Sequence, residues 1–139
     1  MANILLIEPL QSVARQIMTW LLRDGHGYYW SISGRLGVKA WLATNLKFDT
    51  LLMNFESDDW NATEVLAVLL GKNRMPQHAV IYFESSITPE ELADRVQELE
   101  PLIPPSVSLV LLHQGGDFDL KSRLAIASIP VTSQKEEVQ

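Results

Sequence analysis

The sequence predicts an α/β fold in which helices cover both faces of a parallel β-sheet. The first observation is that five short apolar runs, each too short for a helix, recur along the chain. The second is that a helical pattern or a helix-start signal follows each run. The third is that 139 residues, 47% of them hydrophobic, fit one domain with a sizeable core. Strict alternation of strands and helices favours right-handed crossovers, and therefore a parallel sheet between two helical layers.

The five apolar runs are the expected strands. The first, NILLI, is continuous rather than alternating, which is typical of a strand buried on both faces. The second, YYWSI, is aromatic and is expected at an edge of the sheet, where alternate side chains point to opposite faces. The expected strands span residues 3–7, 28–32, 49–53, 79–83 and 107–113. Five such strands commonly take the order 2-1-3-4-5, the flavodoxin-like (βα)5 three-layer sandwich, with ligands at the carboxyl ends of the strands.

The first two helices are predicted from apolar periodicity. The first has an apolar face at three- and four-residue steps, formed by Leu10, Val13, Ala14, Ile17 and Leu21. Asp24-Gly25 should end it. The second and weaker helix covers residues 34–46, with Leu36, Ala40 and Ala43 on one side and Val38, Trp41 and Leu42 nearby.

The third and fourth helices are predicted from their capping residues. Asn61 followed by Glu64 has the spacing of a capping box and should start a helix over about 62–71. Thr88-Pro89 followed by Glu91 is a still stronger start, because proline suits the first helical position. Prolines from residue 101 onward end that helix. A last helix is suggested by Leu120, Leu124 and Ala127.

Composition excludes several classes of function. The net charge of −6 and the pI of about 4.9 disfavour binding to nucleic acid by this domain. The chain has no cysteine, so disulfides, thiolate chemistry and cysteine zinc sites are excluded. No apolar run approaches the roughly 20 residues of a membrane helix. The N-terminus has no signal-peptide pattern, so a cytoplasmic protein without membrane contact is expected.

Polar residues follow the strands at the edge where a ligand would bind. They are Glu8-Pro9, Asn54, Glu84-Ser85 and His113-Gln114. Residues 8 and 54 are 46 positions apart, and residues 54 and 84 are 30 apart. This spacing, with the stretches ILLIEP, LLRDGHGYYW, FDTLLMNF and AVIYFES, resembles the receiver domain of bacterial two-component response regulators. The resemblance covers roughly residues 3–129, so residues 1–129 are predicted to form one receiver-like domain and residues 130–139 a polar tail.

The chain departs from the receiver pattern at each position that carries its chemistry. The resemblance implies an acidic pair, but the second member is Pro9, and the phosphoaccepting aspartate is replaced by Asn54. An amide has no nucleophilic carboxylate and cannot form an acyl phosphate. Glu84 stands where the family has threonine or serine, with Ser85 one residue away. His113 or Gln114 stands where the family has a lysine that neutralises the phosphate. In the last strand, an aliphatic residue stands where the family has an aromatic one. The pattern predicts a pseudo-receiver without phosphotransfer, catalysis, cofactor or metal.

Several residues have more than one interpretation. Asn54 could cap the following turn. Glu8 and Glu84 could keep a residual metal site, although two carboxylates are a poor set and hydrogen-bonded or solvated side chains are favoured. His113 could respond to pH, but a histidine without a special role is favoured. Trp60, in an acidic loop, is favoured to pack on the core and could instead contact a partner.

Two functions remain open at this stage. The first is a phosphorylation-independent protein-interaction domain in signalling, with a weak homodimer through the region 88–129. Lys121 and Arg123 would then supply charges opposite to the acidic helix that begins at Thr88. The second is a flavodoxin-like domain that binds a nucleotide or another small ligand. It is disfavoured because the first strand-to-helix turn has no glycine and contains Glu8, which would repel phosphate.

Overall fold

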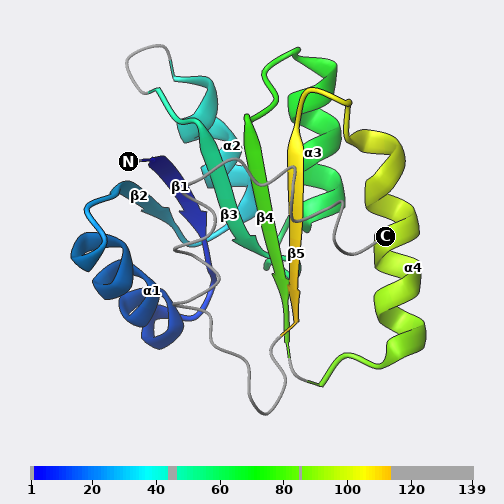
Figure 1. Ribbon diagram of the computed structural model, residues 1–139, viewed down its shortest axis with the longest axis horizontal. Coiled ribbons are helices and arrows are strands. Elements are labelled where there is room, and N and C mark those ends of the chain that lie inside the picture. The colour runs from blue at the N-terminus through cyan, green and yellow to red at the C-terminus, as the bar shows by residue number, and fades with distance from the viewer. Residues whose placement is uncertain (1, 44–46, 85, 114–139) are drawn as a thin grey trace.

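The computed structural model describes residues 2–43, 47–84 and 86–113, and for His113 the backbone alone. Five parallel strands form one sheet in the order β2-β1-β3-β4-β5. The strands are β1 (Asn3–Ile7), β2 (Gly27–Ser31), β3 (Thr50–Asn54), β4 (His78–Phe83) and β5 (Ser108–His113). The helices are α1 (Gln11–Arg23), α2 (Gly34–Leu42), α3 (Ala62–Gly71) and α4 (Pro89–Leu99), followed by the 3₁₀ helix η1 (Glu100–Leu102). The predicted fold class and strand order are confirmed (Figure 1).

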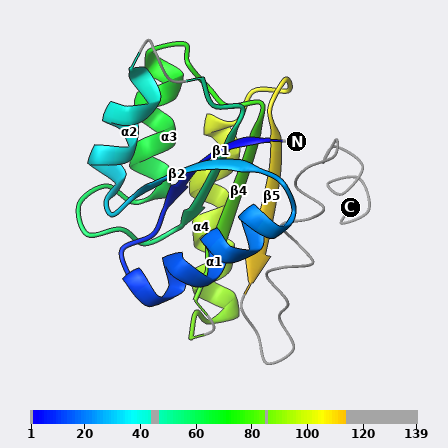
Figure 2. The ribbon, with the colours of Figure 1, turned by 90° about the vertical axis from the view of Figure 1, so that its left-hand side faces the viewer.

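The sheet separates two hydrophobic cores. Figure 2 shows α1 on one face of the sheet and α2, α3 and α4 on the other. Because side chains alternate along a strand, Leu5 and Ile7 of β1 join the core under α2–α4, whereas Ile4 and Leu6 join the core under α1. Each strand of the sheet centre is thus buried on both faces, as the continuous apolar runs predict.

The capping signals mark the helix starts correctly. Asn61 and Glu64 form a reciprocal capping box at the start of α3. Thr88 and Glu91 do the same for α4, whose first residue is Pro89. Gly25, at φ 81, follows the end of α1 in the left-handed conformation that glycine adopts readily. The local sequence therefore determines these boundaries.

Other boundaries and faces differ from the expectation. Leu10 is 57% exposed and lies before α1, and Leu36 is 52% exposed on α2. The buried face of α2 instead contains Gly34, Gly37, Val38 and Trp41. Gly37 packs directly against Ile7 of β1, where a Cβ atom on residue 37 would lie 2.7 Å from Ile7 Cγ1. A larger residue at position 37 would therefore keep α2 from packing this closely on β1.

Most strand boundaries, counting both starts and ends, differ from the expected ones by one residue. The important shift is in β3, which ends at Asn54 rather than at residue 53 and so places Asn54 inside the sheet. The predicted fifth helix, the domain end at 129 and the tail 130–139 lie outside the described residues, as do Lys121 and Arg123. Within the described part of the chain, no helix is long and apolar enough to cross a membrane.

Candidate functional site

The carboxyl ends of β1, β3 and β4 bring three polar side chains together. Glu8 directly follows β1, Asn54 is the last residue of β3, and Tyr82 of β4 lies opposite Asn54 in the register. Tyr82 belongs to the core under α1. Glu8 and Asn54 keep the alternation of Leu6 and Leu52, which belong to the same core, so all three side chains point to that side of the sheet. We call these three residues the Glu8 network.

Glu8 is fully buried, and its carboxylate accepts three hydrogen bonds. Oε1 accepts from the Tyr82 hydroxyl at 2.5 Å and from Asn54 Nδ2 at 3.2 Å. Oε2 accepts from the backbone N–H of Leu10 at 2.7 Å. A buried carboxylate is costly unless its oxygens are hydrogen-bonded, and these donors meet that need. The sequence-based expectation of a hydrogen-bonded Glu8 is confirmed.

Tyr82 is held in its protonated form. Burial raises its pKa well above that of a free tyrosine, and the charge of Glu8 and the hydrogen bond to Glu8 raise it further. The hydroxyl therefore remains a donor throughout the neutral range. A hydrogen bond from a hydroxyl to a carboxylate is among the shorter and stronger kinds in proteins, in agreement with the 2.5 Å distance.

Asn54 uses both ends of its amide. Nδ2 donates to Glu8, and Oδ1 accepts from the backbone N–H of Glu56 at 3.1 Å, so Asn54 also caps the turn after β3. This confirms the turn-capping interpretation. An aspartate could make the second bond but could not donate to Glu8. The amide is thus the group that suits a position between a carboxylate and a backbone donor.

Two residues of the edge strand β2 hold the backbone of Glu8 in place. Trp30 Nε1 donates to the Glu8 carbonyl at 3.0 Å, and Glu8 N donates to the Ser31 carbonyl at 3.1 Å. Trp30 and Tyr28 are half-buried against the core under α1, while Tyr29 points to the other face and is 47% exposed. The expected alternation of β2 is confirmed.

The other predicted site residues do not join the network. Pro9 is half-buried and carries no carboxylate, and Glu84 is exposed after β4. Ser85 lies outside the described residues, and of His113 only the backbone, paired with Phe83, is described. Among the described residues, no group of three acidic, histidine or cysteine side chains could hold a metal ion.

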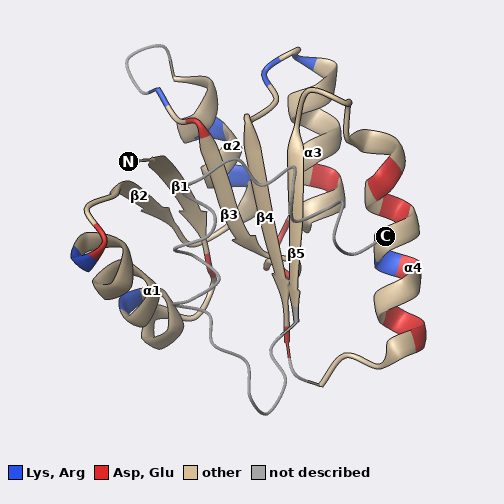
Figure 3. Cartoon of the chain, viewed as in Figure 1, with Lys and Arg blue, Asp and Glu red and all other residues tan. Residues whose placement is uncertain are grey.

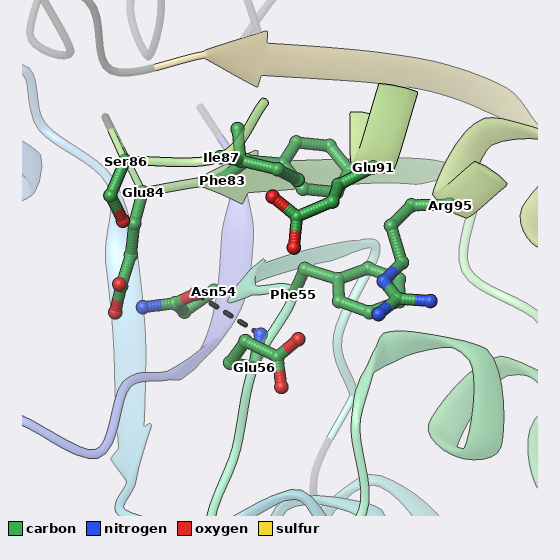
Figure 4. A pocket seen from close by; sticks show the side chains of 9 residues that line it. All are labelled: Asn54, Phe55, Glu56, Phe83, Glu84, Ser86, Ile87, Glu91 and Arg95. Atoms are coloured by element: carbon green, nitrogen blue, oxygen red, sulfur yellow. Dashed lines mark hydrogen bonds between the residues drawn. The ribbon is translucent and has the colours of Figure 1, made fainter. Parts of the chain in front are cut away.

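A cavity of about 170 Å³ opens on the α4 side of the same sheet edge. Figure 4 shows Asn54 at one side of it and Arg95 at the other, with Phe55 and Phe83 between them. The two rings stack with centroids 5.3 Å apart, and the Arg95 guanidinium lies 5.4 Å from the Phe55 centroid. The carboxylates of Glu56, Glu84 and Glu91 also line the cavity.

The connection between β3 and α3 is fastened to α2. Gly34 N donates to Ser57 Oγ at 2.8 Å, and Asp59 Oδ1 accepts from the backbone N–H groups of Arg35 and Trp60 at 3.2 and 2.6 Å. Burial tends to raise the pKa of Asp59, but these hydrogen bonds outweigh it and hold that pKa below its usual value. Trp60 is half-buried against the core, as favoured; its contact with a partner stays a prediction.

Sequence reasoning missed Tyr82 and Arg95. The apolar run 79–83 contains Tyr82 only as one residue of a strand, although the hydroxyl of a buried tyrosine usually needs a partner. That signal could have directed attention to Glu8. The sequence shows Arg95 only as a charged residue of an acidic helix, and its place over Phe55 depends on how α4 packs.

No protein-family model and no curated protein matches the sequence. Solved structures do match. A response regulator receiver domain protein from Clostridium thermocellum has a TM-score of 0.72 and 13% identity, with 100% of each chain covered. The receiver domain of the Francisella response regulator 1452 has a TM-score of 0.71 and 14% identity, over 96% of this chain and 99% of that one.

The Vibrio cholerae chemotaxis protein CheY4 has a TM-score of 0.68 and 16% identity, over 92% of this chain and 97% of that one. Identities this low carry information on fold, while the site has to be judged from its own residues. The similarity extends along nearly the whole of each chain and agrees with the strand order observed. The chain has the fold of a response regulator receiver domain.

Proposed function

We propose that this chain is a phosphorylation-independent signalling domain that acts through protein contacts and not as an enzyme. The receiver-like fold supports a role in signalling, because the structures it resembles are response regulator receivers. The observation that carries the rest of the proposal is the Glu8 network. Its carboxylate is hydrogen-bonded by neutral protein groups, and an amide occupies the strand end where the resemblance places a phosphoaccepting aspartate.

The chemistry of the network argues against phosphotransfer. Asn54 has no carboxylate to attack a phosphoryl group. Mg²⁺ prefers several oxygen ligands in octahedral geometry, yet Pro9 offers none and the oxygens of Glu8 already accept three hydrogen bonds. About one of the four acceptor sites of the Glu8 carboxylate is therefore left for a metal, which is fewer than the several oxygen ligands that Mg²⁺ needs.

Amide spectra of the full chain test this proposal. We would titrate the protein with beryllofluoride and Mg²⁺, and separately incubate it with acetyl phosphate and measure its intact mass. We expect no added phosphate and no saturable shifts at residues 8, 54 and 84. Saturable shifts at these positions, or a mass increase of one phosphate, would contradict the proposal.

We further propose weak self-association through residues 88–129. Helix α4 carries exposed acidic side chains around a single partly buried arginine, and Figure 3 marks the positions of the acidic residues along the helix in red. Lys121 and Arg123 are the proposed opposite charges. Exposed ion pairs contribute roughly 0.2–1 kcal/mol each, so the dimer should be weak and salt-sensitive.

Sedimentation equilibrium at low and high salt, with Lys121→Glu and Arg123→Glu as charge reversals, tests the dimer. A monomer under every condition would exclude self-association. A tight dimer that responds neither to salt nor to the reversals would place the contact elsewhere, with Trp60 as the next candidate.

The alternative of nucleotide or flavin binding has less support. The N-terminus of α1, where such a ligand would place a phosphate, already has its Leu10 N–H bonded to the Glu8 carboxylate. A flavin absorbance scan and a thermal-shift panel with nucleotides would detect this activity directly.

A further inference from the structure

We propose that the cavity beside Asn54 binds one basic side chain, lysine or arginine, of a partner protein. This inference rests on the proposed function, since it specifies the chemistry of the protein contact. The cavity lies between the connection that follows β3 and the start of α4, and Asn54, which also belongs to the Glu8 network, lines one side of it (Figure 4).

The size of the cavity favours a single side chain. Its volume of about 170 Å³ is below the roughly 300–1,000 Å³ of pockets that enclose small-molecule ligands. Part of its lining is apolar, because the stacked rings of Phe55 and Phe83 and the side chain of Ile87 contribute to it. The methylene stem of a lysine or arginine can pack on this apolar part while its charged head stays near solvent.

The charges around the opening favour a cation. Glu56, Glu84 and Glu91 line the cavity, against Arg95 as the single basic group in its lining. Arg95 already pairs with Glu98, which lies 2.6 Å from Nη1, and its guanidinium covers the Phe55 ring. An incoming anion would therefore meet three carboxylates and a guanidinium that is already paired.

Two of the three carboxylates are available to a ligand. Glu91 Oε1 accepts from the Thr88 N–H in the capping box of α4, so part of its capacity is used. The side chains of Glu56 and Glu84 make no hydrogen bond or ion pair within the described ranges 2–43, 47–84 and 86–113. They come from two different strand ends, so a cation between them would link the turn after β3 to the turn after β4.

The probe for this inference is Nα-acetyl-lysine methylamide, titrated into the full chain and followed by amide chemical shifts. We expect weak, saturable shifts confined to residues 54–56, 83–84, 86–87, 91 and 95. The norleucine analogue, which has the same stem without the charge, should bind distinctly less well. The glutamate analogue should not bind.

Charge-neutralising variants identify the carboxylates that act. Glu56→Gln and Glu84→Gln should each weaken binding about 2- to 5-fold, the effect of losing one exposed ion pair. Glu90→Gln is the matched control, because Glu90 is an exposed glutamate at the start of α4, next to Glu91, but does not line the cavity. It should leave the affinity unchanged.

Three results would overturn the inference. They are equal binding of the norleucine and lysine probes, preferred binding of the glutamate probe, and an affinity that neither Glu56→Gln nor Glu84→Gln changes. None of them bears on beryllofluoride or acetyl phosphate, so failure here can be distinguished from failure of the proposed function.

Discussion

Replacing Tyr82 with phenylalanine removes one hydroxyl and keeps the ring in a side chain that is 1% exposed. The Glu8 carboxylate, which is fully buried, then loses the donor that lies 2.5 Å away. A hydrogen bond to a charged group contributes about 1.5–3 kcal/mol, so we expect the free energy of unfolding to fall by about 2 kcal/mol. For a domain of this size, that corresponds to a decrease in melting temperature of roughly 6–8 °C.

Urea denaturation followed by tryptophan fluorescence measures this change at pH 7. Tyr29→Phe is the matched control, because Tyr29 is 47% exposed and its hydroxyl makes no hydrogen bond within the described residues. We expect the control to change stability by less than about 0.5 kcal/mol. If Tyr82→Phe costs no more than the control, the hydroxyl does not stabilise the buried carboxylate and our reading of the network is wrong.

The pH dependence gives an independent check on Tyr82. Its folded-state pKa is raised above the unfolded value of about 10, chiefly by burial and then by Glu8. A group with a raised folded pKa contributes stability that is complete below the unfolded pKa and is lost as pH rises towards the folded one. The difference between wild type and Tyr82→Phe should therefore narrow above about pH 10. The Tyr29→Phe control should show no such narrowing.

Three further substitutions test other parts of the structure. Asn54→Asp should not lead to phosphorylation, as measured by intact mass. It puts a second carboxylate beside Glu8, which raises a carboxyl pKa, so stability should fall at pH 7 and the loss should become smaller towards pH 4. Gly37→Ala should cost about 1–3 kcal/mol in urea denaturation, because the methyl group would overlap β1, whereas Gly71→Ala meets nothing within 4 Å and should be neutral or stabilising. The pKa of Asp59 is lowered, so its contribution to the free energy of unfolding is present above about pH 4 and is lost on acidification. Asp59→Asn should therefore lose less stability than the wild type between pH 5 and 3.

The fold could be predicted because its signals are local. Continuous apolar runs marked the strands, and the Asn61–Glu64 and Thr88–Glu91 pairs marked two helix starts that the structure confirms. The α2 face was wrong for a reason outside the helix itself. Periodicity counts Leu36 as apolar and ignores Gly37, yet it is the glycine that lies against β1. Which face of a short helix is buried depends on how closely its partner approaches.

The candidate site could be predicted only in part. The spacing of Glu8 and Asn54 placed them at neighbouring strand ends, and the structure joins them by a hydrogen bond. The third member depends on the register between β3 and β4, which sets Tyr82 opposite Asn54 and cannot be read from either strand alone. The cavity was missed for a similar reason, because its lining requires α4 to pack Arg95 over Phe55.

The Glu8 network also explains why changes at single positions should not recreate a phosphate site. A receiver site gathers several carboxylates that a metal ion must neutralise. Here one buried carboxylate is satisfied by a tyrosine hydroxyl, an asparagine amide and a backbone N–H, all neutral donors. Asn54→Asp removes the amide donor and adds a negative charge in the same step, while the Tyr82 hydroxyl still donates its hydrogen bond to Glu8. Metal binding at this strand end would thus require coordinated changes at residues 9, 54 and 82.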